Sequence, residues 1–188
     1  MVDTGIGKRI AIISTVIAVL LVVLFLAWRA GWLRREREVP TAVQRVPEET
    51  RSVSLYYASR EADRLLSETR EIAVEEGLER QIEAIVSALL EGPSGRDKVN
   101  AIPPGTRVLH VFWEEDTQTV FLDFSRTLVS NHPGGSTGEY FTIGMIVRTV
   151  SANFPQVRRL QFLVDGYPVE TIAGHYAVDQ PIDVLRWR

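Results

Sequence analysis

The chain has 188 residues, with 21 basic and 24 acidic side chains, a net charge of −3 at pH 7 and no cysteine. The absence of cysteine excludes disulfides, thiolate metal sites, a cysteine nucleophile and a cysteine-linked lipid anchor. Residues 1–51 hold eight of the basic and five of the acidic side chains, a balance of +3 that leaves −6 for residues 52–188. Phosphate backbones repel an acidic surface, so we expect no nucleic-acid partner.

The N-terminal region contains an apolar run without a charge, residues 10–28. At about 1.5 Å per residue, a helix of this length reaches about 30 Å, the thickness of a hydrocarbon core. Trp28 and the flanking basic residues are typical of a membrane interface. A cleaved signal peptide has a shorter apolar region and a small-residue cleavage site, which this run does not offer. We therefore expect a tail over 1–9 and a retained transmembrane helix over 10–28.

The orientation of this helix is left open by the charges around it. More Lys and Arg follow the apolar run than precede it, which favours a cytoplasmic C-terminal domain, but long domains translocate largely regardless of charge. Residues 29–51 are charged and contain Pro40 and Pro47. Proline disfavours helix, so this segment is predicted to be a linker.

The rest of the chain alternates between strand and helix patterns. The predicted strands are Val53–Tyr57, a segment within Leu65–Val74, Val108–Trp113, Thr119–Phe124, Arg159–Val164 and Val169–Ile172; the predicted helices run from Leu78 to Gly92 and from Ser136 to before Pro155. This order predicts an α+β domain over 52–183, with two helices on one face of a small mixed sheet, followed by a tail over 184–188.

The second predicted helix carries an unusually wide apolar arc. Burial against a sheet explains part of such an arc, and a partner surface explains the remainder. Tyr140, Phe141 and Met145 are the residues that we expect on this interaction surface.

One catalytic pattern deserves comparison with a structural alternative. Ser136 lies in a G-x-S-x-G sequence, and Asp165 and His175 follow in the order found in α/β-hydrolases. Asn131-His132-Pro133 separates this sequence from the preceding apolar residues, which weakens the required strand–turn–helix context. Ser136 with Glu139 also fits a capping box, in which each side chain bonds the other residue's amide. We favour the capping box.

Metal and cofactor signatures are weak. His110, His132 and His175 form no short-spaced pair, and the acidic run Glu114–Asp116 lacks the alternating ligands of a calcium loop. No dinucleotide or P-loop fingerprint is present. We expect no catalytic residue, metal or cofactor.

Six segments carry a resemblance to a known family: ALLEGP (Ala88–Pro93), AIPPGTRV (Ala101–Val108), VFLDFS (Val120–Ser125), NHPGGST (Asn131–Thr137), IVRTVSANFPQVRRLQFLVDG (Ile146–Gly166) and VETIAGH (Val169–His175). Together they resemble the GerMN domain of spore-germination and cell-envelope proteins, which is similar to ring-building motifs of sporulation and secretion machinery. The resemblance marks a set of motif residues, structural or partner-facing: Gly134, Gly135, Ser136, Glu139, Phe162, Asp165, Gly166, Gly174 and His175.

The resemblance implies a small domain outside the cytoplasmic membrane, without catalytic activity, that mediates interaction or assembly near peptidoglycan remodelling. The sporulation protein after which the domain is named carries two copies and a lipid anchor, whereas this chain has one copy and no cysteine. We therefore expect a single-pass protein of the cytoplasmic membrane whose domain lies in the periplasm or cell wall. Its expected partner is an envelope protein or a second copy. An envelope serine hydrolase using Ser136 and a peptidoglycan-binding module are the alternatives.

Overall fold

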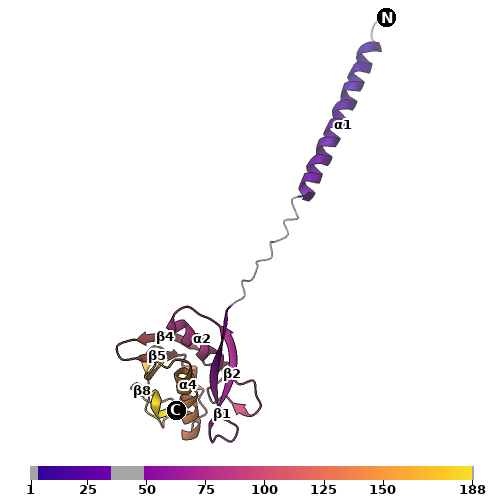
Figure 1. Ribbon diagram of the computed structural model, residues 1–188. Helices are drawn as coiled ribbons and strands as arrows, with labels where there is room; N and C mark the ends of the chain where they lie inside the picture. The colour runs from indigo at the N-terminus through magenta and orange to yellow at the C-terminus, as the bar shows by residue number, and fades with distance from the viewer. Residues whose placement is uncertain (1–3, 35–48, 188) are drawn as a thin grey trace. The chain divides into compact units, whose positions relative to one another are not determined.

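The computed structural model describes residues 4–34 and 49–187, and within the first range the side chains of residues 14–29. The chain divides into two compact units, residues 1–46 and 47–188, which are described separately (Figure 1). The expected linker over 29–51 lies mostly outside the described residues.

The first unit contains helix α1, Thr4–Arg34. Its large apolar side chains between Val16 and Trp28 are each more than half exposed. Among the described residues, no helix is long and apolar enough to cross a membrane. The expected transmembrane helix over 10–28 is therefore not found among them.

The described strands of the second unit form two sheets. The first has the order β2-β1-β3, in which β1 (Thr50–Ser59) pairs antiparallel with β2 (Leu65–Ala73) along its length and with β3 (Lys98–Val99) at its end. The second sheet contains β4 (Val108–Glu114), β5 (Thr119–Phe124), β6 (Arg159–Val164), β7 (Tyr167–Pro168) and β8 (Ile182–Asp183).

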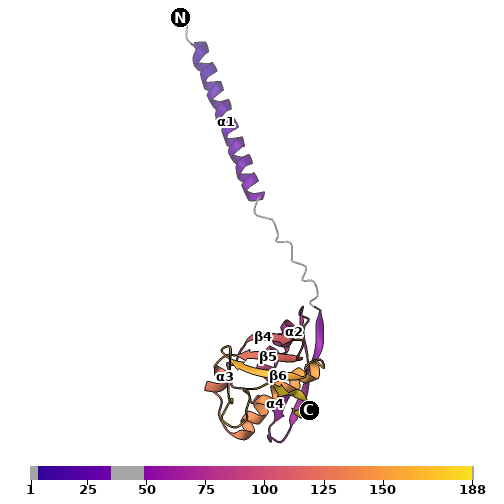
Figure 2. The ribbon, with the colours of Figure 1, turned by 90° about the vertical axis from the view of Figure 1, so that its left-hand side faces the viewer.

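The second sheet is mixed. Strands β4 and β5 form an antiparallel hairpin, and β5 pairs in parallel with β6 (Figure 2). Strands β7 and β8 both pair with β6, one near each of its ends. Parallel neighbours need a long crossover, and α3 (Thr127–Ser130) and α4 (Ser136–Asn153) supply it.

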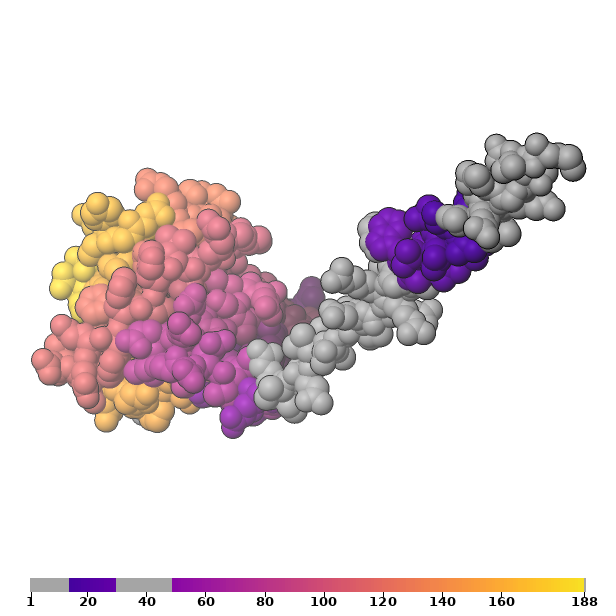
Figure 3. All heavy atoms as spheres, turned by 90° about the horizontal axis from the view of Figure 1, so that it is seen from above, coloured from indigo at the N-terminus to yellow at the C-terminus, as the bar shows by residue number. Residues whose placement is uncertain are grey.

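The helices pack against both sheets. Helix α2 (Leu78–Leu90) contacts β4 and α4, while α4 contacts β1. In the space-filling view, the magenta α2 region lies directly beside the pink region of β4 and β5 (Figure 3). The expected tail begins with the 3-10 helix η1 (Val184–Trp187), which packs on α4 and buries Val184.

The α+β class and the boundaries of the two long helices are confirmed, but the single sheet is wrong. The reason lies at the edge of β1. The Asn153 side chain accepts a hydrogen bond from the Ser54 amide at 3.0 Å and donates one to the Ser54 carbonyl at 2.7 Å. Thr149 Oγ1 accepts a hydrogen bond from the Tyr56 amide at 3.0 Å. These α4 side chains occupy the edge at which a further strand would pair, so the two sheets stay separate.

The strand expected over Val169–Ile172 is also wrong. The hairpin partner of β6 is Tyr167–Pro168, which follows a two-residue turn with positive φ at Asp165 (49°) and Gly166 (82°). This is the type I′ geometry that an Asp-Gly pair favours. Beyond it the chain leaves the sheet, and the Ile172 amide donates to a side chain instead.

Helix α4 lies inside the core and is buried around most of its circumference. Phe141 is 5% and Met145 0% exposed, whereas Tyr140 is 43% exposed. Of the three residues expected on an interaction surface, only Tyr140 is available to a partner. The wide apolar arc is explained by neighbours on several sides: β1, α2 and η1.

Placing a charge in this core should unfold the domain. We expect Met145→Lys to lower the free energy of unfolding by at least about 4 kcal/mol, because an unpaired ammonium would be buried. Urea denaturation of the intact chain checks this. Ala152→Lys adds the same charge at an exposed position of α4 and serves as the control. Equal unfolding midpoints for the two variants would contradict the placement of Met145 in the core.

Candidate functional site

The motif residues gather around a buried carboxylate at the start of α4. Glu139 is 0% exposed. Its Oε1 accepts hydrogen bonds from the Ile172 and Ala173 amides, both at 2.9 Å. Its Oε2 accepts one from the His175 amide at 2.8 Å and lies 3.2 Å from His175 Nδ1. We call this arrangement the Glu139 clasp, because it fastens the loop 172–175 to α4.

The clasp stabilises the charged form of Glu139. Burial alone would raise the pKa of this carboxyl, but the donated hydrogen bonds from the Ala173, His175 and Ile172 amides lower it further than burial raises it. The net result is a pKa below the ordinary value of 4.5. The carboxylate is therefore ionised at neutral pH and acts as a structural anchor for the loop.

The capping box is wrong. Gly135, not Ser136, stands at the N-cap of α4, and no side chain caps this end. Both oxygens of Glu139 accept hydrogen bonds from amides of the loop instead. Without this acceptor, each of the three amides would lose a hydrogen bond. Gly134 and Gly135 have φ of 85° and 83°, a backbone conformation that glycine adopts readily.

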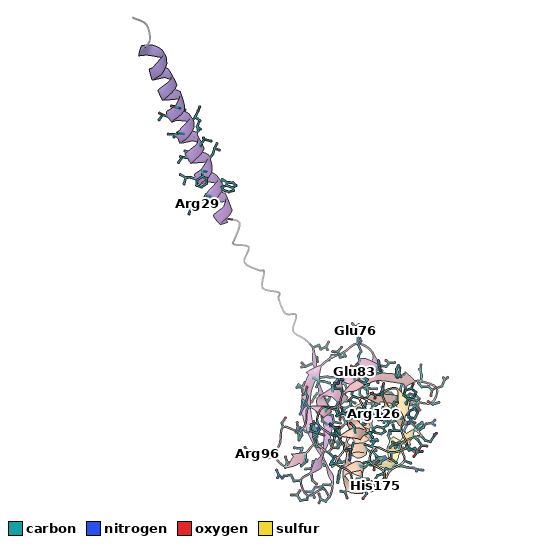
Figure 4. The ribbon with its side chains drawn as sticks, turned by 180° about the vertical axis from the view of Figure 1, so that it is seen from behind. Arg29, Glu76, Glu83, Arg96, Arg126 and His175 are labelled. Atoms are coloured by element: carbon teal, nitrogen blue, oxygen red, sulfur yellow. The ribbon has the colours of Figure 1, made fainter. Side chains whose placement is uncertain are left out.

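The residues of the hydrolase alternative do not form a triad. Ser136 follows a loop after helix α3, not a strand. Among the described residues, no hydrogen bond joins Ser136 to His175 or His175 to Asp165, and the His175 ring bonds Glu139 instead. His175 lies at the end of the domain opposite Glu76 (Figure 4).

A second histidine, His132, forms a separate hydrogen-bond chain beside α4. His132 Nδ1 accepts from the Gly134 amide at 3.1 Å, and its Nε2 lies 3.0 Å from Thr142 Oγ1. The Thr142 hydroxyl donates its hydrogen to the Ala101 carbonyl at 2.9 Å. The His132 Nε2 must therefore be protonated, so that it can donate a hydrogen bond to the Thr142 oxygen. Protonating Nδ1 would break this chain. Burial lowers the pKa of His132 below 6.5, against an opposing effect of the Glu139 charge.

The remaining motif residues are structural. Asp123 is buried on β5, and its Oδ1 accepts from the Gly166 amide at 2.8 Å, which fixes the β6–β7 turn. Phe162 is fully buried and stacks on Phe124 with centroids 6.0 Å apart. Gly174 has φ of 94°, and its amide donates a hydrogen bond to Thr171 Oγ1 at 2.9 Å. Phe162, Gly166 and Gly174 therefore all take part in contacts that hold the fold.

The histidines considered as metal ligands are engaged elsewhere. His110 Nδ1 lies 3.2 Å from Asp123 Oδ2, while His132 and His175 take part in the contacts above. Within residues 14–29 and 49–187, no three His, Asp or Glu side chains gather in a way that could hold a metal ion.

The clasp leads directly to a cluster of aromatic rings on the surface. Tyr176 follows the clasped loop, and its ring lies 5.9 Å from Tyr140 and 6.5 Å from Trp187. The Tyr140 and Trp187 rings are 4.8 Å apart. Gly144 makes room for this packing, because a Cβ there would lie 3.3 Å from the Trp187 ring.

Hollows surround these rings. One of about 320 Å³ joins Ser136 and Thr137 to Tyr140 and Tyr176. A second, of about 270 Å³, lies against Tyr140 and Trp187 and is lined by Arg64, Arg148 and Arg186. We call the three rings and three arginines the aromatic–arginine surface: Tyr140, Tyr176, Trp187, Arg64, Arg148 and Arg186.

Of this surface, the sequence predicts only Tyr140 as an interaction residue. One signal was available: Tyr140, Gly144 and Arg148 recur every four residues and so lie on one face of α4. A glycine inside a long apolar helix indicates a close neighbour. The other members come from the β1–β2 turn, the clasped loop and η1, which only the folded chain brings together.

Comparison with known proteins places the fold. The model of the Germane family, described as "Sporulation and spore germination", matches residues 54–170. A candidate lipoprotein from Clostridium perfringens is similar in structure, with a TM-score of 0.51, 23% identity, and coverage of 71% of this chain and 87% of that one. The tandem GerMN domains of the sporulation protein GerM from Bacillus subtilis match with a TM-score of 0.53 and 16% identity, covering 72% of this chain and 45% of that one. No curated protein matches the chain.

Neutralising the clasp should destabilise the domain in a pH-dependent way. Glu139→Gln replaces one acceptor oxygen with an NH₂ group that faces other donors. We therefore expect the free energy of unfolding to fall by about 2–3 kcal/mol at pH 7. Urea denaturation over a range of pH measures this. Glu170→Gln, which removes an exposed carboxylate in the same loop, is the matched control.

The sign of the pH effect follows from the lowered pKa of Glu139. The contribution of Glu139 to stability is fully present above the pKa that the carboxyl has in the unfolded chain. It is lost as the pH falls below 4.5 and through the lower pKa of the folded protein. The difference in free energy of unfolding between the parent chain and Glu139→Gln should therefore become smaller in acid. Below about pH 6.5 His132 destabilises both proteins, and it destabilises Glu139→Gln more, because that variant lacks the Glu139 charge that opposes the lowering of the His132 pKa. The narrowing of the difference is therefore measured below pH 4.5, where Glu139 itself is protonated. A gap that is constant with pH would show that Glu139 is not an ionised anchor.

Proposed function

Because the chain belongs to the Germane family of sporulation and spore germination proteins, we propose that it is a membrane-attached cell-envelope protein. In this proposal its Germane domain lies outside the cytoplasmic membrane and works by binding other proteins, without catalysing a reaction. A second copy of the chain is one such partner, and peptidoglycan is a further candidate ligand.

One observation carries the binding role: the side chains of Glu139 and His175, which could take part in catalysis, are used to hold the fold. Both oxygens of Glu139 accept backbone hydrogen bonds, and the His175 ring faces Glu139. A hydrolase needs its imidazole within reach of the serine oxygen. The aromatic–arginine surface lies next to this framework and is suited to recognition.

The membrane attachment is supported by α1. Large apolar side chains between Val16 and Trp28 are each more than half exposed. A helix that is apolar around its whole circumference is unfavourable in water. A lipid or protein environment would cover them. The structural relatives are described as a candidate lipoprotein and a sporulation protein, and a lipoprotein is held at a membrane by other means. We propose that α1 replaces a lipid anchor in this chain.

Cysteine labelling tests the proposed location, since the chain has no cysteine of its own. Ser94 lies exposed in the loop after α2, and Ser94→Cys introduces a single thiol there. With any outer envelope permeabilised, a membrane-impermeant maleimide should label this thiol in intact spheroplasts. Thr4→Cys, at the other end of α1, is the matched control and should be labelled only after lysis.

The two variants separate the possible outcomes. Labelling of Ser94→Cys only after lysis would place the domain in the cytoplasm and contradict the proposal. Labelling of both variants in intact spheroplasts would leave the domain outside but contradict a helix that crosses the membrane.

A further inference from the structure

The aromatic–arginine surface combines one exposed and two partly buried rings with positive charge. Tyr140, 43% exposed, contacts the rings of Tyr176 and Trp187, so its position is fixed before any ligand arrives. Beyond Trp187 a further hollow of about 440 Å³ extends the surface towards Asp179 and Asp183. Pre-positioned rings lose little conformational freedom on binding, which favours recognition.

The hollow of about 270 Å³ is the positive part of this surface. Three arginines line it, Arg64, Arg148 and Arg186, and Asp63 is the one acidic residue beside them. Asp63 pairs with Arg64 at 3.1 Å. The hollow therefore keeps an excess of two positive charges.

The other two guanidinium groups are left for a ligand. Arg148 lies over the Tyr56 ring, 4.9 Å from its centroid, which holds the side chain without neutralising it. Within the described part of the chain, neither Arg148 nor Arg186 forms an ion pair with a carboxylate. Residues 52–188 carry a net charge of −6, so this positive patch lies on a domain that is acidic as a whole.

These features specify the chemistry of a partner. Tyr, Trp and Arg are the residues enriched in the energetically dominant positions of protein interfaces. Guanidinium groups bind carboxylates through two parallel hydrogen bonds. We propose that the aromatic–arginine surface binds an acidic segment of another protein, with carboxylates on Arg148 and Arg186 and an apolar side chain against Tyr140 and Trp187. This inference rests on the proposed binding role and names its site and partner chemistry.

Panning a random peptide library on the immobilised intact chain tests this inference directly. The enriched peptides should be rich in Asp and Glu and should contain an apolar or aromatic residue. Arg186→Gln and Arg148→Gln should each weaken their binding about tenfold, because each removes a charge-assisted hydrogen-bonding group. Arg186 is exposed, so its replacement leaves the core intact.

Arg126→Gln is the matched control. It removes the same charge from an exposed arginine next to α3, which lies on the opposite side of the folded unit from the C-terminal end (Figure 2). Binding should be unchanged in this variant. Equal weakening by Arg126→Gln would mean that net charge, and not this surface, attracts the peptides, and would overturn the inference.

Three further results would also overturn it. Failure to enrich acidic peptides would show that the surface does not select an acidic partner. Competition by neutral chitooligosaccharides would show that the surface is a glycan site. Concentration-dependent association of the chain that is lost in Arg186→Gln would make a second copy the occupant, through an acidic segment such as Glu114–Asp116. None of these results bears on the cysteine labelling, so the location proposed above stands or falls separately.

Discussion

The C-terminal segment of the domain, and the surface that it helps to form, depend on one buried carboxylate. Glu139 accepts hydrogen bonds from the amides of Ile172, Ala173 and His175, and so ties the first turn of α4 to a loop more than thirty residues later. Its charge is stabilised there by the same amides that it orders. A buried charge is tolerable only with such partners. The carboxylate thereby determines the path of the chain after β7.

Helix α4 joins this constraint to the surface. Its first turn holds the loop, its middle fills the core with residues such as Met145, and its last turn satisfies the edge of β1 through Asn153. The loop delivers Tyr176, and η1 delivers Trp187, to the exposed Tyr140 on the same helix. Ring contacts and arginines from distant segments are thus assembled by a single helix and its carboxylate. The surface is a product of the fold and needs no mobile part.

The sequence predicted elements well where local patterns decide them. The apolar period of α4, the Gly92 stop after α2 and the β4–β5 hairpin are local, and all three match the structure. The sequence-based predictions are wrong where the structure depends on contacts between residues far apart along the chain. The role of Glu139 was misassigned because a capping box is visible locally, whereas its three amide donors lie beyond residue 171. The separation of the sheets was missed because Asn153 and Ser54 are 99 positions apart. The sequence places Phe141 and Met145 on the surface, because the elements that bury α4 come from segments distant along the chain.

Amide hydrogen exchange of the intact chain is the most direct test of whether Glu139 organises the C-terminal segment. In the parent chain the amides of Ile172, Ala173 and His175 should exchange slowly despite lying in a loop. In Glu139→Gln, exchange over 172–187 should accelerate well before that of β5 and β6, because the segment loses its anchor while the sheet remains. Equal exchange of this segment in the two proteins, or acceleration of the whole domain together, would contradict the account.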